Sequence, residues 1–375
     1  MDVIYLDNAA TSFPKPPCVG RAMAGALASC GANPGRAGHK LALAAGRIVE
    51  GCREDIAAML GETDASRVVF AQNATDALNM AIHGALRTGD HAIATLLEHN
   101  SVLRPLTELS RSGAITLTLI PPDGMGRIHA ADVERAMTRR THLVVMTHMS
   151  NVLGLVQDVA AVGEICRQRG VLFLVDCAQT AGHLPLTPIP WGAAMLAMPG
   201  HKGLLGPHGT GALWVKQGVQ LAPLRQGGTG SASESMLQPE MMPDALESGT
   251  LNLPGIAGLR AGMKEALCRR KEAHERAAEL CDGMREALIS LPGVQVYTQR
   301  GASLLSFNVQ GVSSQEAAAV LDSEGIAVRG GLHCAPGTHR FLGTLNTGAV
   351  RVSPGLYSDR KDAEALVRAV EKMCR

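Results

Sequence analysis

The sequence is poor in aromatic rings, has almost no net charge and contains no long apolar run. Aromatic residues make up 3% of the 375 residues, and 35 Lys and Arg residues balance 34 Asp and Glu residues. Without stacking rings or a basic patch, the chain lacks the features that bind nucleic acid, so we expect no such partner. Apolar runs such as 41–45 and 171–175 are too short to cross a bilayer, so we expect no membrane span.

Patterns that indicate secretion, disulfides or a metal are also missing. The first residues do not resemble a secretion leader, and the nine cysteines are an odd number without Cys-x-x-Cys spacing. We therefore expect reduced thiols in a cytoplasmic protein. His333, Cys334 and His339 have no second ligand pair at zinc-finger spacing, so we predict no metal site.

What the sequence does contain is an alternation of short apolar runs and helical periodicity between about residues 17 and 215. Seven runs have the composition of buried strands: 68–71, 92–96, 115–120, 143–146, 171–175, 194–197 and 211–215. Helical periodicity lies between several of them, at 75–86, 130–138 and 158–169. Continuously apolar strands that alternate with helices predict an α/β fold with a mostly parallel seven-stranded sheet, covered on both faces.

The rest of the chain has a different pattern. Residues 220–250 are loop-like, a long helical pattern covers 254–291, and strands and helices then mix at 304–309, 314–324 and 361–372. This mixture predicts a smaller C-terminal α+β domain. We predict three parts: an N-terminal segment over residues 1–15 that packs on the small domain, a large domain over 16–255 and the small domain over 256–375.

Polar residues directly follow four of the apolar runs. They are Glu98-His99-Asn100, Thr147-His148-Met149-Ser150-Asn151, Asp176-Cys177-Ala178-Gln179 and Gly200-His201-Lys202-Gly203. Taken singly, Asp176 could cap a turn, His99 could be a half-buried histidine and Lys202 could lie on the surface. Ligands of open α/β sheets, however, bind beyond the carboxyl ends of the strands, so four such ends together predict a site.

Pyridoxal phosphate (PLP) is the cofactor that fits this set. The chain has neither a P-loop nor a Gly-x-Gly-x-x-Gly turn that opens a helix, which leaves nucleotide cofactors without support. An amine such as that of Lys202 can bond the PLP aldehyde, and the Asp176 carboxylate can keep the ring nitrogen protonated. His99 would stack on the ring, and Asn151 and Gln179 would contact its hydroxyl. The phosphate needs a helix N-terminus and a hydroxyl, which the segment Ala74-Thr75 offers.

These motifs resemble the class V aminotransferase family, which consists of fold-type I PLP-dependent transferases. Asp7-Asn8-Ala9-Ala10-Thr11, Gly249-Thr250-Leu251-Asn252 and Arg329-Gly330-Gly331-Leu332-His333-Cys334-Ala335 add to the match, which runs from residue 5 to residue 357. The nearest branch is that of cysteine desulfurases and selenocysteine lyases. The resemblance implies that Lys202 bonds the cofactor and that Asp176 pairs with its ring nitrogen.

The resemblance also implies roles around the ring and the phosphate. His99 matches the histidine that stacks on the ring and handles protons, while Asn151 and Gln179 match the contacts to the ring hydroxyl. Thr75 and His201 correspond to phosphate ligands. The partner subunit would supply a further one, Thr250, so the resemblance implies a homodimer with shared sites.

Around the substrate, Arg351 matches the arginine that grips the carboxylate, and Arg329 matches a second substrate-contacting arginine. Cys334 stands where desulfurases keep the thiol that takes sulfur. Two positions depart from the family pattern. Pro199 replaces a serine or threonine that donates to the phosphate, and Leu332 replaces a histidine of many close relatives.

The leading hypothesis is a PLP-dependent cysteine desulfurase that converts L-cysteine to L-alanine and leaves a persulfide on Cys334 for an acceptor protein. A selenocysteine lyase is the first alternative. A C–S lyase, aminotransferase or epimerase with a dispensable Cys334 is the second. A non-catalytic scaffold that has lost its cofactor is the third, and the presence of Lys202 and Asp176 speaks against it.

Overall fold

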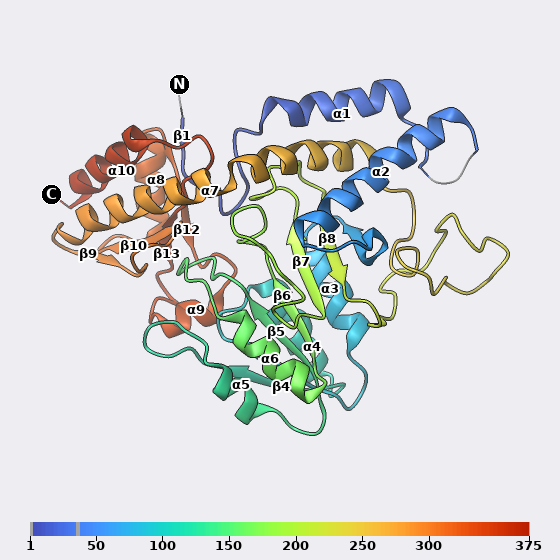
Figure 1. Ribbon diagram of the computed structural model, residues 1–375. Helices are drawn as coiled ribbons and strands as arrows, with labels where there is room; N and C mark the ends of the chain where they lie inside the picture. The colour runs from blue at the N-terminus through green and yellow to red at the C-terminus, as the bar shows by residue number, and fades with distance from the viewer. Residues whose placement is uncertain (1–2, 35–37, 375) are drawn as a thin grey trace.

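The computed structural model describes residues 3–34 and 38–374 and is built around a seven-stranded sheet (Figure 1). Its strands are β2 (Val68–Ala71), β3 (His91–Thr95), β4 (Thr116–Ile120), β5 (Thr141–Thr147), β6 (Leu172–Asp176), β7 (Met195–Pro199) and β8 (Gly211–Val215). Their order is β2-β8-β7-β6-β5-β3-β4, and only the pairs that involve β8 are antiparallel. Each predicted apolar run lies on one of these strands, so the prediction of a mostly parallel seven-stranded sheet is confirmed.

Helices cover both faces of this sheet. They are α2 (Lys40–Met59), α3 (Ala74–Ala85), α4 (Asn100–Arg111), α5 (Ala130–Ala136) and α6 (Val159–Arg169), with a short 3₁₀ turn at Ala65–Arg67. α1 (Pro17–Cys30) packs outside them, on α2 and on the later helix α7 (Leu253–Ile289). Alternate residues of one strand enter opposite cores: Val144 of β5 packs with α2 and α6, whereas Val145 packs with α3 and α4. Because side chains alternate across a strand, a sheet covered on both faces needs the continuously apolar strands seen in the sequence.

A smaller α+β unit holds the C-terminal part of the chain, as predicted. Four antiparallel strands pair in the order β12 (Arg329–Gly331), β13 (Ala349–Val352), β10 (Leu305–Val309) and β9 (Val294–Val296). The helices of this unit are α8 (Ser314–Ser323), α9 (Pro336–Phe341) and α10 (Arg360–Met373). α9 lies in a stretch for which the sequence predicted no helix. Figure 1 shows the unit beside the large sheet, in orange and red.

The helix α7 (Leu253–Ile289) belongs to both units. It begins where the Asn252 side chain accepts a hydrogen bond from the backbone N–H of Gly255, and it continues for 37 residues. Its first half, with Ile256 and Leu259, packs into the core of the large sheet. Its second half, with Met284, packs into the core of the small unit. α7 therefore runs from one core to the other (Figure 1).

The N-terminal segment also joins the two units. β1 (Ile4–Tyr5) pairs in parallel with β11 (Ile326–Ala327) of the small unit, and Asp7 forms a bridge with Ser353. A few residues later the segment reaches the loop after β7. Met1 and Asp2 of the predicted segment lie outside the described residues, and the predicted domain bounds stay predictions. No helix in the described ranges has both the length and the apolarity that crossing a bilayer requires.

Candidate active site

A cavity lies at the carboxyl ends of β5, β6 and β7, where the sequence predicts a site. The residues that line it come from the ends of these strands and from the N-termini of α3 and α4. Seven of the ten predicted cofactor and catalytic positions line it: Ala74, Thr75, His99, Asn151, Asp176, Gln179 and Lys202. His201, Thr250 and Cys334 are not among the lining residues, and neither are Arg329 and Arg351.

An amine and a carboxylate define the floor of the cavity. Asp176 is the last residue of β6 and is 3% exposed, and burial raises the pKa of its carboxyl. Lys202 follows β7, and burial together with the charge of Arg351 lowers the pKa of its amine to about 8. The loop is tightly packed: a Cβ on Gly203 would lie 2.3 Å from the Ala181 carbonyl oxygen, so only glycine fits there.

His99 stands at the N-terminus of α4 and is held in one tautomer. Its Nδ1 accepts a hydrogen bond from the backbone N–H of Ser101 at 3.1 Å, so in the neutral ring the proton lies on Nε2. Burial lowers the pKa of His99 to about 4, so the ring is neutral at physiological pH. The Ser101 hydroxyl lies 2.9 Å from His99 Nδ1 and 2.7 Å from the Thr75 hydroxyl. Ser101 lines the cavity and was missed in the sequence, where only its position next to the His99 motif marks it.

The N-terminus of α3 forms one end of the cavity. The Asn73 side chain caps the helix by accepting from the N–H of Asp76 at 2.9 Å, which leaves the N–H groups of Ala74 and Thr75 without an intrahelical acceptor. Such N–H groups and a hydroxyl favour a bound anion. Pro199 also lines the cavity and offers neither a hydroxyl nor an N–H to that anion.

Two carboxamides tie the cavity to segments distant in the chain. Gln179 donates from Nε2 to the Ala9 carbonyl at 3.1 Å, and Asn151 donates from Nδ2 to the His333 carbonyl at 2.7 Å. The N-terminal segment and the loop that carries Cys334 are therefore both fastened to side chains that line the cavity.

The two predicted substrate arginines share one carboxylate. Arg351 of β13 is buried and donates from Nη2 to Asp7 at 2.9 Å and from Nη1 to the Asn151 carbonyl at 3.3 Å. Arg329 is half exposed and donates from Nε to the other oxygen of Asp7 at 3.2 Å. The Nε of Arg351 is buried and has no partner among the described residues. Burial lowers the pKa of Arg351, which favours a second anion beside it. Asp7 belongs to a motif of the sequence, but its role between the arginines was missed.

Cys334 is one of two exposed cysteines and lies on a strained loop. The φ angles of His333 and Cys334 are 50° and 56°, in the left-handed region that costs about 1–3 kcal/mol for a residue with a side chain. The Cys334 carbonyl accepts from the N–H of Asn100 at 2.7 Å, so the loop is attached directly beside His99. Thr250, in contrast, is exposed.

A second buried acid lies behind the cavity. Glu98 is fully buried and accepts from the Thr95 hydroxyl at 2.6 Å and from the N–H of Thr147 at 3.0 Å. Burial, with a smaller contribution from the charge of Asp176, raises its pKa to about 8. Glu98 joins the ends of β3 and β5 as a neutral acid. Sequence reasoning placed it in a polar motif without a role.

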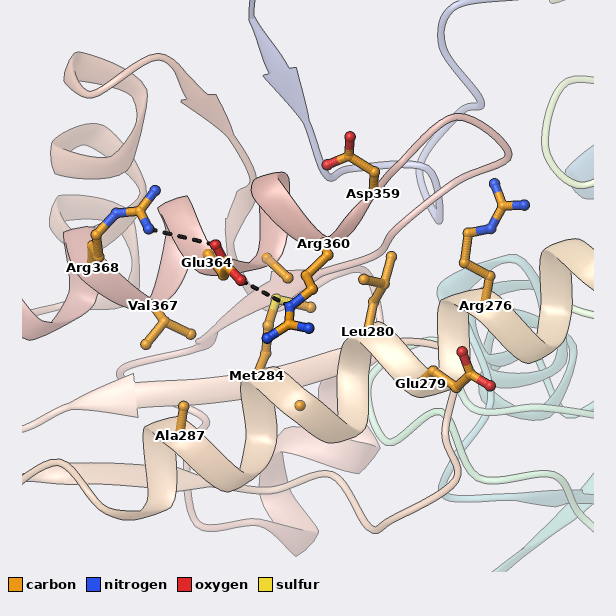
Figure 2. A pocket seen from close by; sticks show the side chains of 12 residues that line it. Arg276, Glu279, Leu280, Met284, Ala287, Asp359, Arg360, Glu364, Val367 and Arg368 are labelled. Carbon is orange, nitrogen blue, oxygen red and sulfur yellow. Dashed lines mark hydrogen bonds and ion pairs between the residues drawn. The ribbon is translucent and has the colours of Figure 1, made fainter.

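A second pocket, on the small unit, is lined by fewer side chains that could take part in a reaction. It lies between α7 and α10, and Glu364 pairs there with Arg360 and Arg368, as Figure 2 shows. No nucleophile lines it. Within the described ranges, no cluster of three or more His, Cys, Asp or Glu side chains is arranged to hold a metal ion.

Comparisons with known proteins give the family. The model of the family described as Aminotransferase class-V matches residues 4–366. A protein of Methanothermobacter thermautotrophicus named a probable cysteine desulfurase is 35% identical over 99% of this chain and 95% of its own length. One of Halalkalibacterium halodurans with the same name is 33% identical over 99% of this chain and 93% of its own length.

Solved structures agree with this result. The cysteine desulfurase of Thermococcus onnurineus superposes with a TM-score of 0.92 and 31% identity, over 100% of this chain and 95% of the other. A cysteine desulfurase of Escherichia coli gives 0.90 and 28% identity, over 99% and 94%. The chain belongs to the class V aminotransferase family, as its motifs predicted.

Proposed function

We propose that this protein is a PLP-dependent cysteine desulfurase that converts L-cysteine to L-alanine and retains the sulfur on Cys334. One observation carries the proposal: a cavity lined by the amine of Lys202 and the buried carboxylate of Asp176 is flanked by a loop that presents an exposed thiol. The relatives named cysteine desulfurases, which match nearly the whole chain, support it.

The residues of the cavity fit PLP. The N-terminus of α3 and the Thr75 hydroxyl suit a phosphate, and the Asp176 carboxylate suits a protonated ring nitrogen. The Asp176 carboxylate takes part in no ion pair among the described residues, and the one hydrogen bond that it accepts there comes from the N–H of Ala178 at 2.8 Å. A carboxylate that is buried with so few partners favours a cationic ligand. When bound, PLP accepts the electron pair that remains when the α proton of an amino acid leaves.

Lys202 and His99 move protons in this proposal. The amine of Lys202 has a pKa near 8, so a useful fraction is neutral at physiological pH and can take the α proton at Nζ. His99 has its proton on Nε2, and Nδ1 is engaged with Ser101. His99 can therefore donate a proton from Nε2, the ring nitrogen that does not contact α4.

Arg351 and Arg329 bind the substrate carboxylate. Arg351 is fixed between Asp7 and the Asn151 carbonyl, and its unpartnered Nε offers a further donor. A guanidinium held in this way recognises a carboxylate by geometry as well as by charge. Arg329 contributes from the exposed rim.

Cys334 takes the sulfur. Its thiolate attacks the sulfur atom of the substrate, an S–S bond forms and the Cβ–S bond breaks. The electron pair of the broken bond stays on carbon and takes up a proton, which gives alanine and a persulfide on Cys334. The reaction needs no external oxidant or reductant. The exposed position of Cys334 lets an acceptor protein reach the persulfide.

Three finer points belong to the proposal. We expect a homodimer, because Thr250 is exposed and lines no part of the cavity of its own chain, as a residue supplied to the partner subunit would. A selenocysteine lyase would use the same cavity, since selenium leaves without needing the thiol. The cytoplasmic location rests on the cysteine pattern of the sequence alone.

The test is a substrate panel on PLP-reconstituted enzyme, in which alanine, pyruvate and sulfide are measured separately with L-cysteine and L-selenocysteine. We expect alanine from cysteine and one extra sulfur on Cys334 by mass spectrometry. Reduction with borohydride followed by peptide mapping should attach the cofactor to Lys202. Pyruvate with ammonia would indicate a C–S lyase, and a cofactor on another amine, or on none, would overturn the proposal.

A further inference from the structure

The two peptide groups on either side of Lys202 are held by the N-terminal segment. The His201 carbonyl, which belongs to the first, lies 2.7 Å from Lys15 Nζ, 3.1 Å from the Ser12 N–H and 3.1 Å from the Thr11 hydroxyl. The Lys202 carbonyl, which belongs to the second, accepts from the Ser12 hydroxyl at 3.0 Å. The contacts come from residues about 190 positions away in the chain.

Lys15 is the centre of this arrangement. Its Nζ donates to the Ser12 hydroxyl oxygen at 2.7 Å as well as to the His201 carbonyl, so Ser12 accepts from Lys15 and donates to Lys202. Hydrogen bonds from a cation are roughly twice as strong as neutral ones. Lys15 and Ser12 therefore fix the backbone on both sides of the Lys202 Cα atom.

Lys15 is partly buried without a carboxylate partner among the described residues, which is unusual for a lysine. It is partly buried, and burial lowers its pKa to about 8 without any acidic group acting in the opposite direction. A buried cation is normally paired with a carboxylate, because desolvation is otherwise unfavourable. Among the described residues, the ammonium has a carbonyl and a hydroxyl as its partners, and both lead to the backbone of Lys202.

We propose that Lys15 is a positioning residue for Lys202, acting through the His201 carbonyl and the Ser12 hydroxyl. The inference rests on the proposed function, since it assigns Lys15 a part in the capture of the PLP aldehyde by Lys202. A lysine reaches its target through four rotatable bonds, so the rate of a reaction at Nζ depends on how firmly the backbone end is anchored. The arginines that bind the substrate carboxylate contact Asp7 and not Lys15, so substrate affinity is a separate quantity.

The test measures how fast cofactor-free protein captures PLP on Lys202, by borohydride quenching at intervals and peptide mapping. In capture, Nζ adds to the aldehyde carbon and water leaves, and borohydride then reduces the product to a stable amine. We expect Lys15→Met to slow capture about tenfold, and Lys15→Arg, which keeps a cationic donor, to stay within about threefold of the wild type. In the loaded enzyme, Lys15→Met should lower kcat and leave KM for cysteine unchanged.

Lys271→Met is the matched control, because Lys271 is exposed on α7 and 88% of its side-chain surface is accessible. A purely structural role would lower the melting temperature of Lys15→Met and leave its capture rate per folded molecule unchanged, and that result would overturn the inference. If Lys15→Met does not fold, Ser12→Ala replaces it, with a smaller slowing expected and wild-type capture as the contrary result. If the wild type does not bond PLP at Lys202, the proposed function itself is wrong. If Lys15→Met captures PLP as fast as the wild type, only the inference about Lys15 is wrong.

Discussion

The two ends of the site, one around Asp176 and Lys202 and the other at Cys334, differ in burial and in backbone conformation. At the cofactor end, Asp176 on the last position of β6 and Glu98 just after β3 are both buried, and burial shifts the pKa of each upward. At the thiol end, Cys334 is exposed on a loop of the small unit, in a backbone conformation that side chains disfavour. Proton transfer needs fixed charges away from water, whereas handing sulfur to another molecule needs access. The fold separates these demands between its two units.

The largest expected effect comes from removing the exposed thiol. Cys334→Ser replaces a thiolate with a hydroxyl that stays protonated at neutral pH and cannot carry sulfur. We expect alanine formation from cysteine to fall at least about 100-fold, while borohydride still attaches PLP to Lys202. The measurement is alanine release under steady-state conditions.

Cys268→Ser is the matched control, since Cys268 is the other exposed cysteine and lies on α7. It should have wild-type activity. Undiminished alanine release by Cys334→Ser would mean that the two ends do not cooperate in the way proposed.

A medium effect is expected from the buried acid of the cofactor end. Burial raises the Glu98 pKa from 4.5 to about 8, so between these values the folded protein keeps a proton that the unfolded chain loses. The free energy of unfolding therefore falls as pH rises through this window, by at most about 1.4 kcal/mol per pH unit. Glu98→Gln keeps a side-chain acceptor for Thr95 and Thr147 but has no proton to lose, so this contribution disappears.

Urea unfolding of both proteins at about pH 5.5 and about pH 7.5 measures the effect, with the stability difference between them expected to change by about 2–3 kcal/mol. Because other groups titrate equally in the two proteins, their contributions cancel. Glu240→Gln, at an exposed position, should show no such change. A pH-independent difference for Glu98→Gln would show that Glu98 is ionised in the folded protein.

The smallest effect compares the two arginines. Arg351 is 3% exposed in its side chain and Arg329 is 52% exposed. A lysine keeps the charge but loses the planar fork, which matters most where the group is buried and fixed. We expect Arg351→Lys to raise KM for cysteine about tenfold, and Arg329→Lys to raise it less than about threefold. Equal effects on KM would contradict the assignment of Arg351 as the main carboxylate ligand.

The sequence predicted the large sheet and the cavity well, for a physical reason. Strands covered on both faces must be apolar throughout, so they stand out, and the polar residues at their ends stand out in turn. Asp176 and Lys202 were found in this way. α4 was not predicted: it is largely polar and has Pro105 inside it. Its apolar residues do recur at helical spacing, as in Val102 and Leu106, but Pro105 interrupts the pattern.

Residues that act through distant contacts could not be predicted. The interest of Asp7 comes from its contacts with Arg329 and Arg351, and that of Lys15 comes from its hydrogen bond to the loop after β7. Each pair is separated by more than 180 positions in the chain. Thr250 and the dimer remain predictions.

The continuity of α7 has a consequence for motion between the two units. A hinge needs a few residues whose backbone torsions can change freely, yet the stretch that joins the two cores is a single helix of 37 residues. Any swing of Cys334 relative to Lys202 would have to bend that rod, peel it from one core or be confined to the short loop around Cys334 itself. In the last case, the Cys334 loop would deliver sulfur by its own motion while the two units keep their relative positions.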